Sequence, residues 1–315
     1  MGIKRLTAFL TANYDPVAHP PTVLPPGSRL LIDASGWSFL LQAACVAAGV
    51  RQDHLGDYGA LDRAVEEMVQ KIRSAGVVPI LYCDGEVRQM KAAATKRRRE
   101  QRDGKWELLQ GTCLDGQRVQ QKDLPEPPLM MRQVLATAAA LCVQVVRCRG
   151  EADQDMAIAC AEQRHGDWPH YVLGQDSDFY MFRGCNYVCF GDLTFSASDG
   201  SAGPQCSPHP RTARAVVWTR AILSEMTGLN ERQLIEFAIL LGNDYTAPFS
   251  KDLYGDEVAA LGNDEFDPDV ILEFVAEAAP ELRLSSNFAN VQRAIDFSRA
   301  LYECEDLSAF PADAE

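Results

Sequence analysis

The sequence predicts an α/β protein in which a mostly parallel sheet is flanked by helices and followed by an acidic, helical C-terminal region. Two observations lead to this fold class. Short apolar runs alternate with segments whose apolar residues recur at helical spacing, which is the pattern of parallel strands joined by crossover helices. Residues 247–315 hold 16 acidic and 4 basic residues. We therefore expect residues 1–246 to form the core and residues 247–315 to form a mainly helical acidic region.

The first half of the core contains two predicted strands with a helix between them. RLLID (29–33) follows the turn residues PPGS, and VVPILYCD (77–84) is a second apolar run, so both predict buried strands. Apolar residues recur at helical spacing from Leu61 to Ile72, and Gly76 ends this helix. The segment from about Asp103 to Glu126 is hydrophilic and predicts a loop.

The second half continues the alternation of strands and helices. The predicted elements are a helix at 127–141, a strand at 142–147 (CVQVVR), a helix from Glu151 to about Gln163 and a strand at 170–175 (HYVLGQ). Further predictions are edge strands at YVCF (187–190) and AVVW (215–218), a loop at 198–213, a helix at 229–245 with Asn230 as N-cap, and helices near 268–278 and 287–304.

The composition is typical of a globular protein. The 315 residues are 47% hydrophobic, which is enough for a sizeable core. No apolar run approaches the roughly 20 residues that cross a bilayer. The N-terminal MGIKRLTAFL is too short in apolar residues for a signal peptide, and Leu6 stands where a myristoylation motif has Ser or Thr. We expect an intracellular protein that is neither secreted nor bound to a membrane.

The cysteines are scattered, as is typical of an intracellular protein. Cys45, Cys83, Cys142 and Cys160 lie in apolar runs, which predicts that they are small buried hydrophobic residues. Cys206 and His209 could form half of a zinc site. No second half follows in a usable spacing, so a loop is the preferred interpretation of this segment.

The formal net charge of −14 argues at first against nucleic acid as a partner. However, residues 247–315 alone carry −12, so the first 246 residues carry only −2. Several acids of the core are, in addition, candidates for neutralisation by a metal. The core can therefore present a positive face to a nucleic acid.

Acidic residues stand repeatedly where predicted strands end. In open parallel sheets, ligands bind outside the carboxyl ends of the strands. The acids expected there are Asp33, Asp84, Glu151, Asp153, Asp176, Asp178 and Asp244. Converging carboxylates would repel by about 4 kcal/mol per pair at ~4 Å and an effective dielectric constant near 20, so cations must lie among them. Alternatively, some are helix caps and turn formers, and Glu151 would be favourable at a helix N-terminus whatever its function.

Oxygen ligands without His or Cys favour Mg²⁺ or Mn²⁺ over zinc. Two such ions about 4 Å apart can activate a water and stabilise the leaving oxygen in phosphodiester hydrolysis. The basic stretch CDGEVRQMKAAATKRRREQR begins at the second strand's end, and Lys91 and Arg98 are seven residues apart, so they share a helix face that suits a phosphate. The alternative is a solvated basic face or a nuclear-import patch, KRRRE.

Six motifs together resemble those of the flap endonuclease/XPG superfamily, which comprises metal-dependent, structure-specific nucleases with a PIN-like core. In order they are MGIKRL, LLIDASGWSF, YCDGEVRQMK with KRRR, GEADQDMA, GQDSDF and ILLGNDY, and they lie within residues 1–246. GDYGALDRAVEEMVQKI and the EADQD pattern look like the Asteroid branch of that superfamily. The resemblance implies a PIN-like fold and a nuclease activity on DNA with single-stranded or branched structure.

The resemblance also implies residue roles. The seven acids named above match the family's metal ligands and imply two Mg²⁺ (or Mn²⁺) ions. Asp153 is shorter than the glutamate that flap endonucleases commonly place there. Lys91 and Arg98 match the basic pair that contacts the scissile phosphate, and the neighbouring Lys96 and Arg97 are expected to bind nucleic acid.

Two further positions match residues near the substrate. Phe39 matches an aromatic side chain that stacks on a nucleobase, although on an apolar helix face it could equally be a core residue. Gly2 matches an N-terminus that lies near the substrate.

The chain departs from the family pattern in two places. Flap endonucleases follow the last aspartate with a glycine-rich helix-hairpin that grips duplex DNA, and TAPFSKDLYGDEVAALG has no such pattern. The region from about Asp103 to Glu126, where the family builds a helical arch, is hydrophilic. Two functions therefore remain as alternatives. The first is an endonuclease that acts on DNA, which we expect to be intracellular and nuclear. The second is a catalytically weak nucleic-acid-binding or scaffolding protein.

Overall fold

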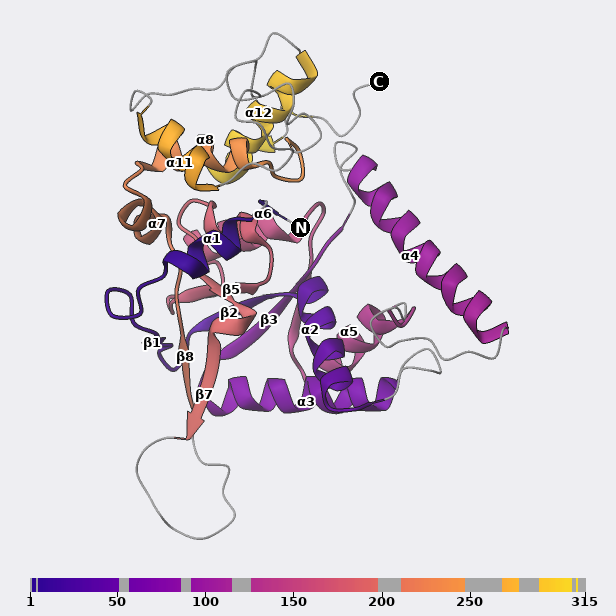
Figure 1. The fold of residues 1–315 in the computed structure, drawn as a ribbon. Helices are drawn as coiled ribbons and strands as arrows, with labels where there is room; N and C mark the ends of the chain where they lie inside the picture. The colour runs from indigo at the N-terminus through magenta and orange to yellow at the C-terminus, as the bar shows by residue number, and fades with distance from the viewer. Residues whose placement is uncertain are drawn as a thin grey trace. The chain divides into compact units, whose positions relative to one another are not determined.

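The structure is a computed structural model that describes residues 2–3, 5–50, 57–85, 92–114, 126–197, 211–246, 268–277, 289–307 and 310. Strands and helices alternate along the first part of the chain, and helices dominate the last part (Figure 1). The elements are α1 (Leu6–Asn13), β1 (Thr22–Val23), β2 (Arg29–Asp33), α2 (Ala34–Ala47), α3 (Tyr58–Ser74), β3 (Val78–Cys83), α4 (Ala92–Leu114), α5 (Met130–Ala140), β4 (Gln144–Arg147), α6 (Ala152–Ala161), β5 (His170–Gly174), the 3-10 helices η3 (Ser177–Tyr180) and η4 (Phe190–Asp192), β6 (Tyr187–Cys189), β7 (Leu193–Ala197), β8 (Arg211–Ala215), α7 (Arg220–Thr227), α8 (Glu231–Leu241), α11 (Pro268–Glu277) and α12 (Ala289–Tyr302).

The main sheet has five strands in the order β4-β3-β2-β5-β6. β2 pairs in parallel with β3, β3 with β4, and β5 with β6. A second sheet has the order β1-β8-β7, in which β1 and β8 are antiparallel. The predicted α/β fold with a mostly parallel sheet flanked by helices is thereby confirmed.

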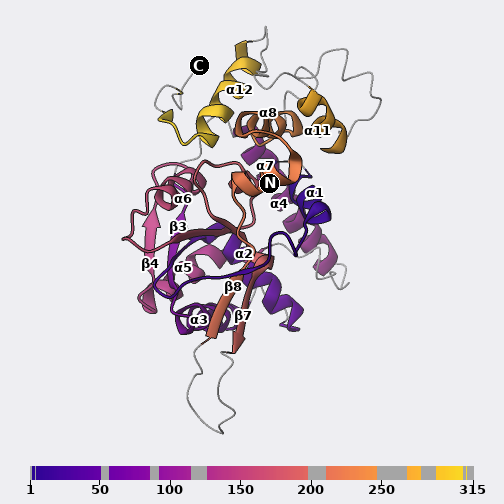
Figure 2. The ribbon, with the colours of Figure 1, turned by 90° about the vertical axis from the view of Figure 1, so that its left-hand side faces the viewer.

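The chain divides into two compact units, one of residues 25–152 with 195–213 and the other of residues 1–24, 153–194 and 214–315. In the first, α2, α3 and α5 pack against one another, and α2 and α3 pack on β3. In the second, α8 packs with α7, α11 and α12 (Figure 2). The C-terminal helices thus belong to the same unit as α8, and the predicted division at residue 246 stays a prediction.

The two helices with the clearest sequence signals form for the expected reasons. Along α3, Leu61, Val65 and Ile72 are buried on one face, and the helix is followed by Gly76 at φ 76°, a left-handed conformation that glycine adopts without strain. α8 begins with a capping box, in which the Asn230 side chain accepts from the Gln233 backbone N–H and the Gln233 side chain accepts from the Asn230 N–H. The predicted N-cap at Asn230 is confirmed.

One predicted loop is wrong in its first half. α4 continues to Leu114, so residues 103–114 are helical rather than a loop. Its described side chains from Arg99 to Gly104 are exposed, and a Cβ added at Gly104 or Gly111 would meet no atom within 4 Å. A solvated helix satisfies its own backbone hydrogen bonds and needs no apolar face. The hydrophilic composition of this segment therefore did not distinguish a helix from a loop. The rest of the predicted loop up to residue 125 lies outside the described residues.

Three smaller predictions need correction. The second edge strand is β8 at Arg211–Ala215 rather than 215–218, although Trp218 forms an isolated bridge to Tyr187. The predicted loop at 198–213 therefore loses its last three residues to β8, and residues 198–210 lie outside the described residues. Cys45, Cys83 and Cys160 are buried as predicted, but Cys142 is exposed because it lies in the turn after α5. No described helix is both long and apolar enough to cross a membrane.

Candidate active site

Asp33 and Asp84 lie at the ends of neighbouring parallel strands of the first unit. Asp33 is the last residue of β2, and its carboxylate accepts hydrogen bonds of 2.9 Å from the N–H groups of Ser35 and Gly36 at the start of α2. Asp84 comes directly after β3 and accepts a hydrogen bond of 2.8 Å from the N–H of Ala152. Asp84 therefore lies against the chain segment that contains Glu151.

A close backbone approach holds these two segments together. The N–H of Gly85 donates to the carbonyl of Gly150 at 2.7 Å. A Cβ at position 85 would lie only 2.2 Å from the carbonyl oxygen of Cys148, so only glycine fits there without a shift of backbone. The position of Asp84 relative to residues 148–152 is thus fixed by main-chain contacts.

The charges of Asp33 and Asp84 act at a common point. Burial raises the pKa of the Cys83 thiol, Arg147 opposes this, and the carboxylates of Asp84 and Asp33 raise that pKa further. Both carboxylates therefore lie close enough to Cys83 to act on its thiol.

Asp176 and Asp178 follow β5 in the second unit, as the sequence predicts. Asp176 caps η3 by accepting a hydrogen bond of 3.1 Å from the N–H of Asp178. This turn explains the spacing of the two acids, since an aspartate commonly accepts from the backbone two residues further on. Asp178 is itself buried, with 3% of its surface exposed.

Gly2 lies against the same turn. Its φ is +51°, and a Cβ at this position would lie 1.9 Å from Oδ1 of Asp176. The hydroxyl of Ser177 donates to the carbonyl of Ile3 at 3.0 Å and fixes the segment in place. The start of the described chain therefore reaches a predicted metal ligand, and only glycine permits this approach.

Asp178 is held by a side chain from the C-terminal region. The hydroxyl of Tyr302 donates to Oδ1 of Asp178 at 2.7 Å. Tyr302 is fully buried, and burial raises the pKa of its phenol well above the ordinary value, with the charges of Asp178 and Asp176 acting in the same direction. The two carboxylates thus both act on this phenol, within the second unit.

Asp244 lies in a turn after α8 rather than at the end of that helix. The side chain of Asn243 forms this turn, because its Oδ1 accepts hydrogen bonds of 2.9 Å from the N–H groups of Tyr245 and Thr246. Asn243 is 1% exposed, and Asp244 is half-buried. Glu151 and Asp153 stand on either side of Ala152, the first residue of α6, and both are half-buried.

The donor set fits a hard divalent cation in its chemistry. All seven predicted ligands are carboxylates, and in each unit two of them lie close to one neighbouring group, Cys83 or Tyr302. Such paired negative charge favours a cation with oxygen ligands. Within the described residues, however, no group of three or more His, Cys, Asp or Glu side chains is arranged to hold a metal ion.

The predicted nucleic-acid contacts are described only in part. Lys91 and the side chains of Arg97 and Arg98 lie outside the described residues, as do Cys206 and His209 of the possible zinc half-site. Lys96 lies on α4, with 78% of its side chain exposed and its Nζ 3.9 Å from Glu100. Phe39 on α2 is 48% exposed, which excludes the alternative that it is a core residue.

Two residues at the site were not predicted from the sequence. Tyr302 is 124 residues from Asp178 and carries no local signal, because a tyrosine at helical spacing is typical of a core position. Asn243 stands next to Asp244 in ILLGNDY, and its readiness to hydrogen-bond the following backbone could have indicated the turn.

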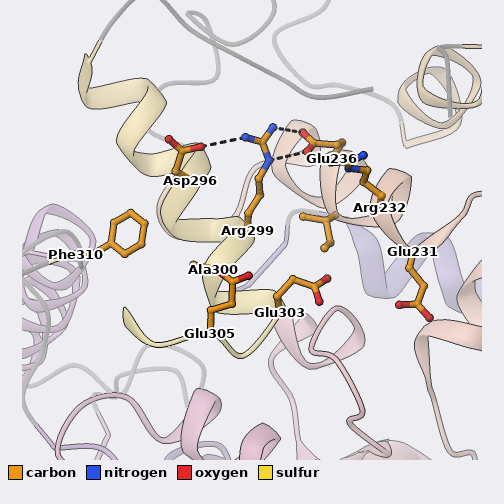
Figure 3. A pocket seen from close by; sticks show the side chains of 10 residues that line it. Glu231, Arg232, Glu236, Asp296, Arg299, Ala300, Glu303, Glu305 and Phe310 are labelled. Atoms are coloured by element: carbon orange, nitrogen blue, oxygen red, sulfur yellow. Dashed lines mark hydrogen bonds and ion pairs between the residues drawn. The ribbon is translucent and has the colours of Figure 1, made fainter. Parts of the chain in front are cut away.

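The lining of a cavity of about 560 Å³ between α8 and α12 includes none of the predicted ligands. Figure 3 shows Arg299 bridging Glu236 and Asp296 at this cavity. Its lining consists of Glu231, Arg232, Ile235, Glu236, Asp296, Arg299, Ala300, Glu303, Glu305 and Phe310. Arg299 thus pairs with Glu236 on α8 and with Asp296 on its own helix, α12.

Comparison with known proteins identifies relatives among nucleases. No family model matches the chain. The chain is 24% identical over 264 residues to flap endonuclease 1 of Cryptosporidium muris (strain RN66), a match that covers 78% of this chain and 52% of the relative. The chain thus spans about half the length of the curated relative that it matches.

The solved structures confirm the fold. The catalytic core of Rad2 in complex with DNA substrate superimposes with a TM-score of 0.51 at 17% identity, covering 98% of this chain and 89% of that one. The chain therefore has the fold of flap endonuclease/XPG-type nucleases. These relatives support the superfamily's fold and not the narrower Asteroid branch.

Proposed function

We propose that the protein is a metal-dependent, structure-specific endonuclease that hydrolyses phosphodiester bonds in single-stranded or branched DNA. The observation that supports this proposal is the placement of acids at or just beyond the ends of β2, β3 and β5 in a fold shared with the Rad2 catalytic core, which was solved with a DNA substrate. The flap endonuclease relative supports the same reaction class.

The ligands of two Mg²⁺ or Mn²⁺ ions would be the seven acids Asp33, Asp84, Glu151, Asp153, Asp176, Asp178 and Asp244. When bound, such ions supply activation of water and stabilisation of the leaving oxygen. The protein itself supplies carboxylates that are already oriented. Backbone N–H groups orient Asp33, Asp84 and Asp176, and a phenol orients Asp178.

The substrate would be bound by cationic and aromatic side chains. Lys91 and Arg98 would contact the scissile phosphate, and Lys96 and Arg97 would contact neighbouring phosphates. The exposed ring of Phe39 is available to stack on an unpaired base, which favours single-stranded or branched DNA over an intact duplex. Hydrolysis adds water across one P–O bond, and the leaving oxygen takes up a proton.

The competing hypothesis is a catalytically weak nucleic-acid-binding or scaffolding protein with the same fold. Two observations keep it in view. No three-ligand metal group is found among the described residues, and the sequence lacks a glycine-rich helix-hairpin after Asp244. This hypothesis predicts binding of DNA without cleavage. The Asteroid branch and a nuclear location are likewise predictions that await a test.

Labelled flap, overhang, hairpin and single-stranded substrates, incubated with pure protein in Mn²⁺ or in EDTA, distinguish the two functions. We expect cleavage of at least one structured or single-stranded substrate in Mn²⁺ and none in EDTA. Parallel RNA versions of the substrates determine which nucleic acid is cut. Binding without cleavage in Mn²⁺ would favour the scaffolding hypothesis and contradict the proposal.

A further inference from the structure

A chain of buried hydrogen bonds runs from α12 to Asp178. The hydroxyl of Ser298 donates to the carbonyl of Ala294 at 2.9 Å. The Asn243 amide donates both to Ser298 Oγ at 3.0 Å and to the Tyr302 hydroxyl at 2.9 Å. The Tyr302 hydroxyl in turn donates to Asp178 Oδ1 at 2.7 Å. The Asn243 amide thus serves two acceptors, and the last acceptor of the chain is the Asp178 carboxylate.

The network is shielded from water along its whole length. Ser298 and Tyr302 are 0% exposed, Asn243 is 1% exposed, and Asp178 is 3% exposed. Water cannot replace a lost partner at such positions, so removing one group leaves its neighbour with an unsatisfied polar atom. A fully satisfied buried network is therefore rigid, and it holds the Asp178 carboxylate in one orientation.

Asn243 connects this network to a second predicted ligand. The same side chain that donates to Tyr302 accepts from the backbone N–H groups of Tyr245 and Thr246 and so forms the turn around Asp244. The N–H of Asn243 is held as well, because it donates to the Thr246 hydroxyl at 3.1 Å. One buried amide thus positions both the Asp244 turn and the phenol that holds Asp178.

We infer that Tyr302 and Asn243 are positioning residues for the predicted metal ligands Asp178 and Asp244, so that helix α12 of the acidic C-terminal region orients ligands within its own unit. The inference rests on the proposed function. Partners that orient a metal ligand typically change metal affinity or activity by about 10- to 100-fold when removed. A neutral phenol is suited to this task, because it fixes a carboxylate without supplying a positive charge that would compete with the metal.

The variant Tyr302→Phe tests this inference, because it keeps the ring in the core and removes only the hydroxyl. Mn²⁺ affinity is measured by calorimetric titration of the DNA-free protein, and cleavage is measured over a range of Mn²⁺ concentrations. We expect the Mn²⁺ dissociation constant to rise at least about tenfold. We also expect high Mn²⁺ to restore most of the cleavage rate, which a general loss of stability would not allow.

Tyr187→Phe is the matched control. Tyr187 is 1% exposed, belongs to the same unit, and donates its hydroxyl to the backbone carbonyl of Gly174 at 3.2 Å instead of to an acid. We expect this control to lose stability without losing Mn²⁺ affinity. Equal Mn²⁺ affinity in Tyr302→Phe and the wild type would overturn this inference but not the proposed function. An equal loss of Mn²⁺ affinity in Tyr302→Phe and Tyr187→Phe would do the same.

Two further outcomes are a wild-type protein that does not bind Mn²⁺ and a Tyr302→Phe variant that does not fold. A wild-type protein that binds no Mn²⁺ would overturn the proposed function and this inference with it. If Tyr302→Phe does not fold, Ser298→Ala replaces it, since it removes one partner of Asn243 and leaves the Tyr302 hydroxyl in place. A smaller loss of Mn²⁺ affinity in Ser298→Ala would then support the inference, and an unchanged affinity would overturn it.

Discussion

Asp178 is the one buried residue among the seven predicted ligands, and its carboxylate accepts a hydrogen bond from the phenol of Tyr302. Asp178→Asn removes the charge but keeps the shape, and the amide oxygen can still accept from Tyr302. We expect the fold to be kept and metal-dependent cleavage to fall by at least about 100-fold, as is typical when one key electrostatic group is lost. Cleavage assays and thermal unfolding measure the two effects.

Asp192→Asn provides the control for this prediction. Asp192 also accepts a hydrogen bond from a neutral donor, the Trp218 indole at 2.9 Å, but it is not a predicted ligand. We expect its cleavage rate to match the wild type. Wild-type cleavage by Asp178→Asn would contradict the two-metal proposal.

A variant of Lys91 tests whether this side chain contributes to DNA binding or to the catalytic step. If its ammonium stabilises charge that develops only in the transition state, Lys91→Ala reduces kcat far more than it weakens DNA binding. Single-turnover rates and binding isotherms on the same substrate separate the two quantities. Equal losses in both would make Lys91 a general phosphate contact. Lys96→Ala, on the exposed part of α4, is the comparison, for which we expect weaker binding and a smaller salt dependence.

At the scale of elements, the contact between α8 and α12 depends on a buried ion pair. Arg299 donates to both carboxylate oxygens of Glu236 at 2.7 and 2.9 Å, and Glu236 is 1% exposed (Figure 3). We expect Arg299→Met to destabilise the protein by about 3 kcal/mol, because it removes the charge that balances a buried carboxylate. Urea unfolding measures this loss.

The double variant Glu236→Met with Arg299→Met is the control for this effect. Removing both charges avoids the uncompensated carboxylate, so we expect most of the stability to return. A double variant that is as unstable as Arg299→Met would show that the loss comes from packing rather than from charge. Since α12 also carries Tyr302, Arg299→Met is further expected to weaken Mn²⁺ binding.

For the whole molecule, the acidic C-terminal region is expected to add nothing favourable to DNA binding. Counterion release favours only cationic contacts with phosphate. Glu273 and Glu305 are exposed acids of this region. We expect the variant Glu273→Gln with Glu305→Gln to bind branched DNA as tightly as the wild type or more tightly across a salt titration. A marked loss of affinity in a folded variant would show that this region is a binding element.

Local patterns were sufficient to predict most of the fold. The apolar runs at 29–33, 77–84 and 170–175 correspond to β2, β3 and β5, and the Asn230 cap begins α8 as expected. These elements could be predicted because hydrophobic periodicity and helix capping depend on only a few neighbouring residues. α4 was missed beyond residue 103 because a solvated helix has no apolar face to recognise.

The sequence by itself determined which acids follow which strands, since the spacing of DSD after β5 and of Asp84 after β3 is a local property. Only the tertiary structure decided what holds them. Tyr302 donates a hydrogen bond to Asp178, which lies 124 residues away in the chain. The N–H of Gly85 donates to the carbonyl of Gly150, and the two backbone segments lie so close that a side chain at position 85 would not fit. Contacts of this kind depend on how distant elements pack against one another. Periodicity along the chain therefore does not predict them.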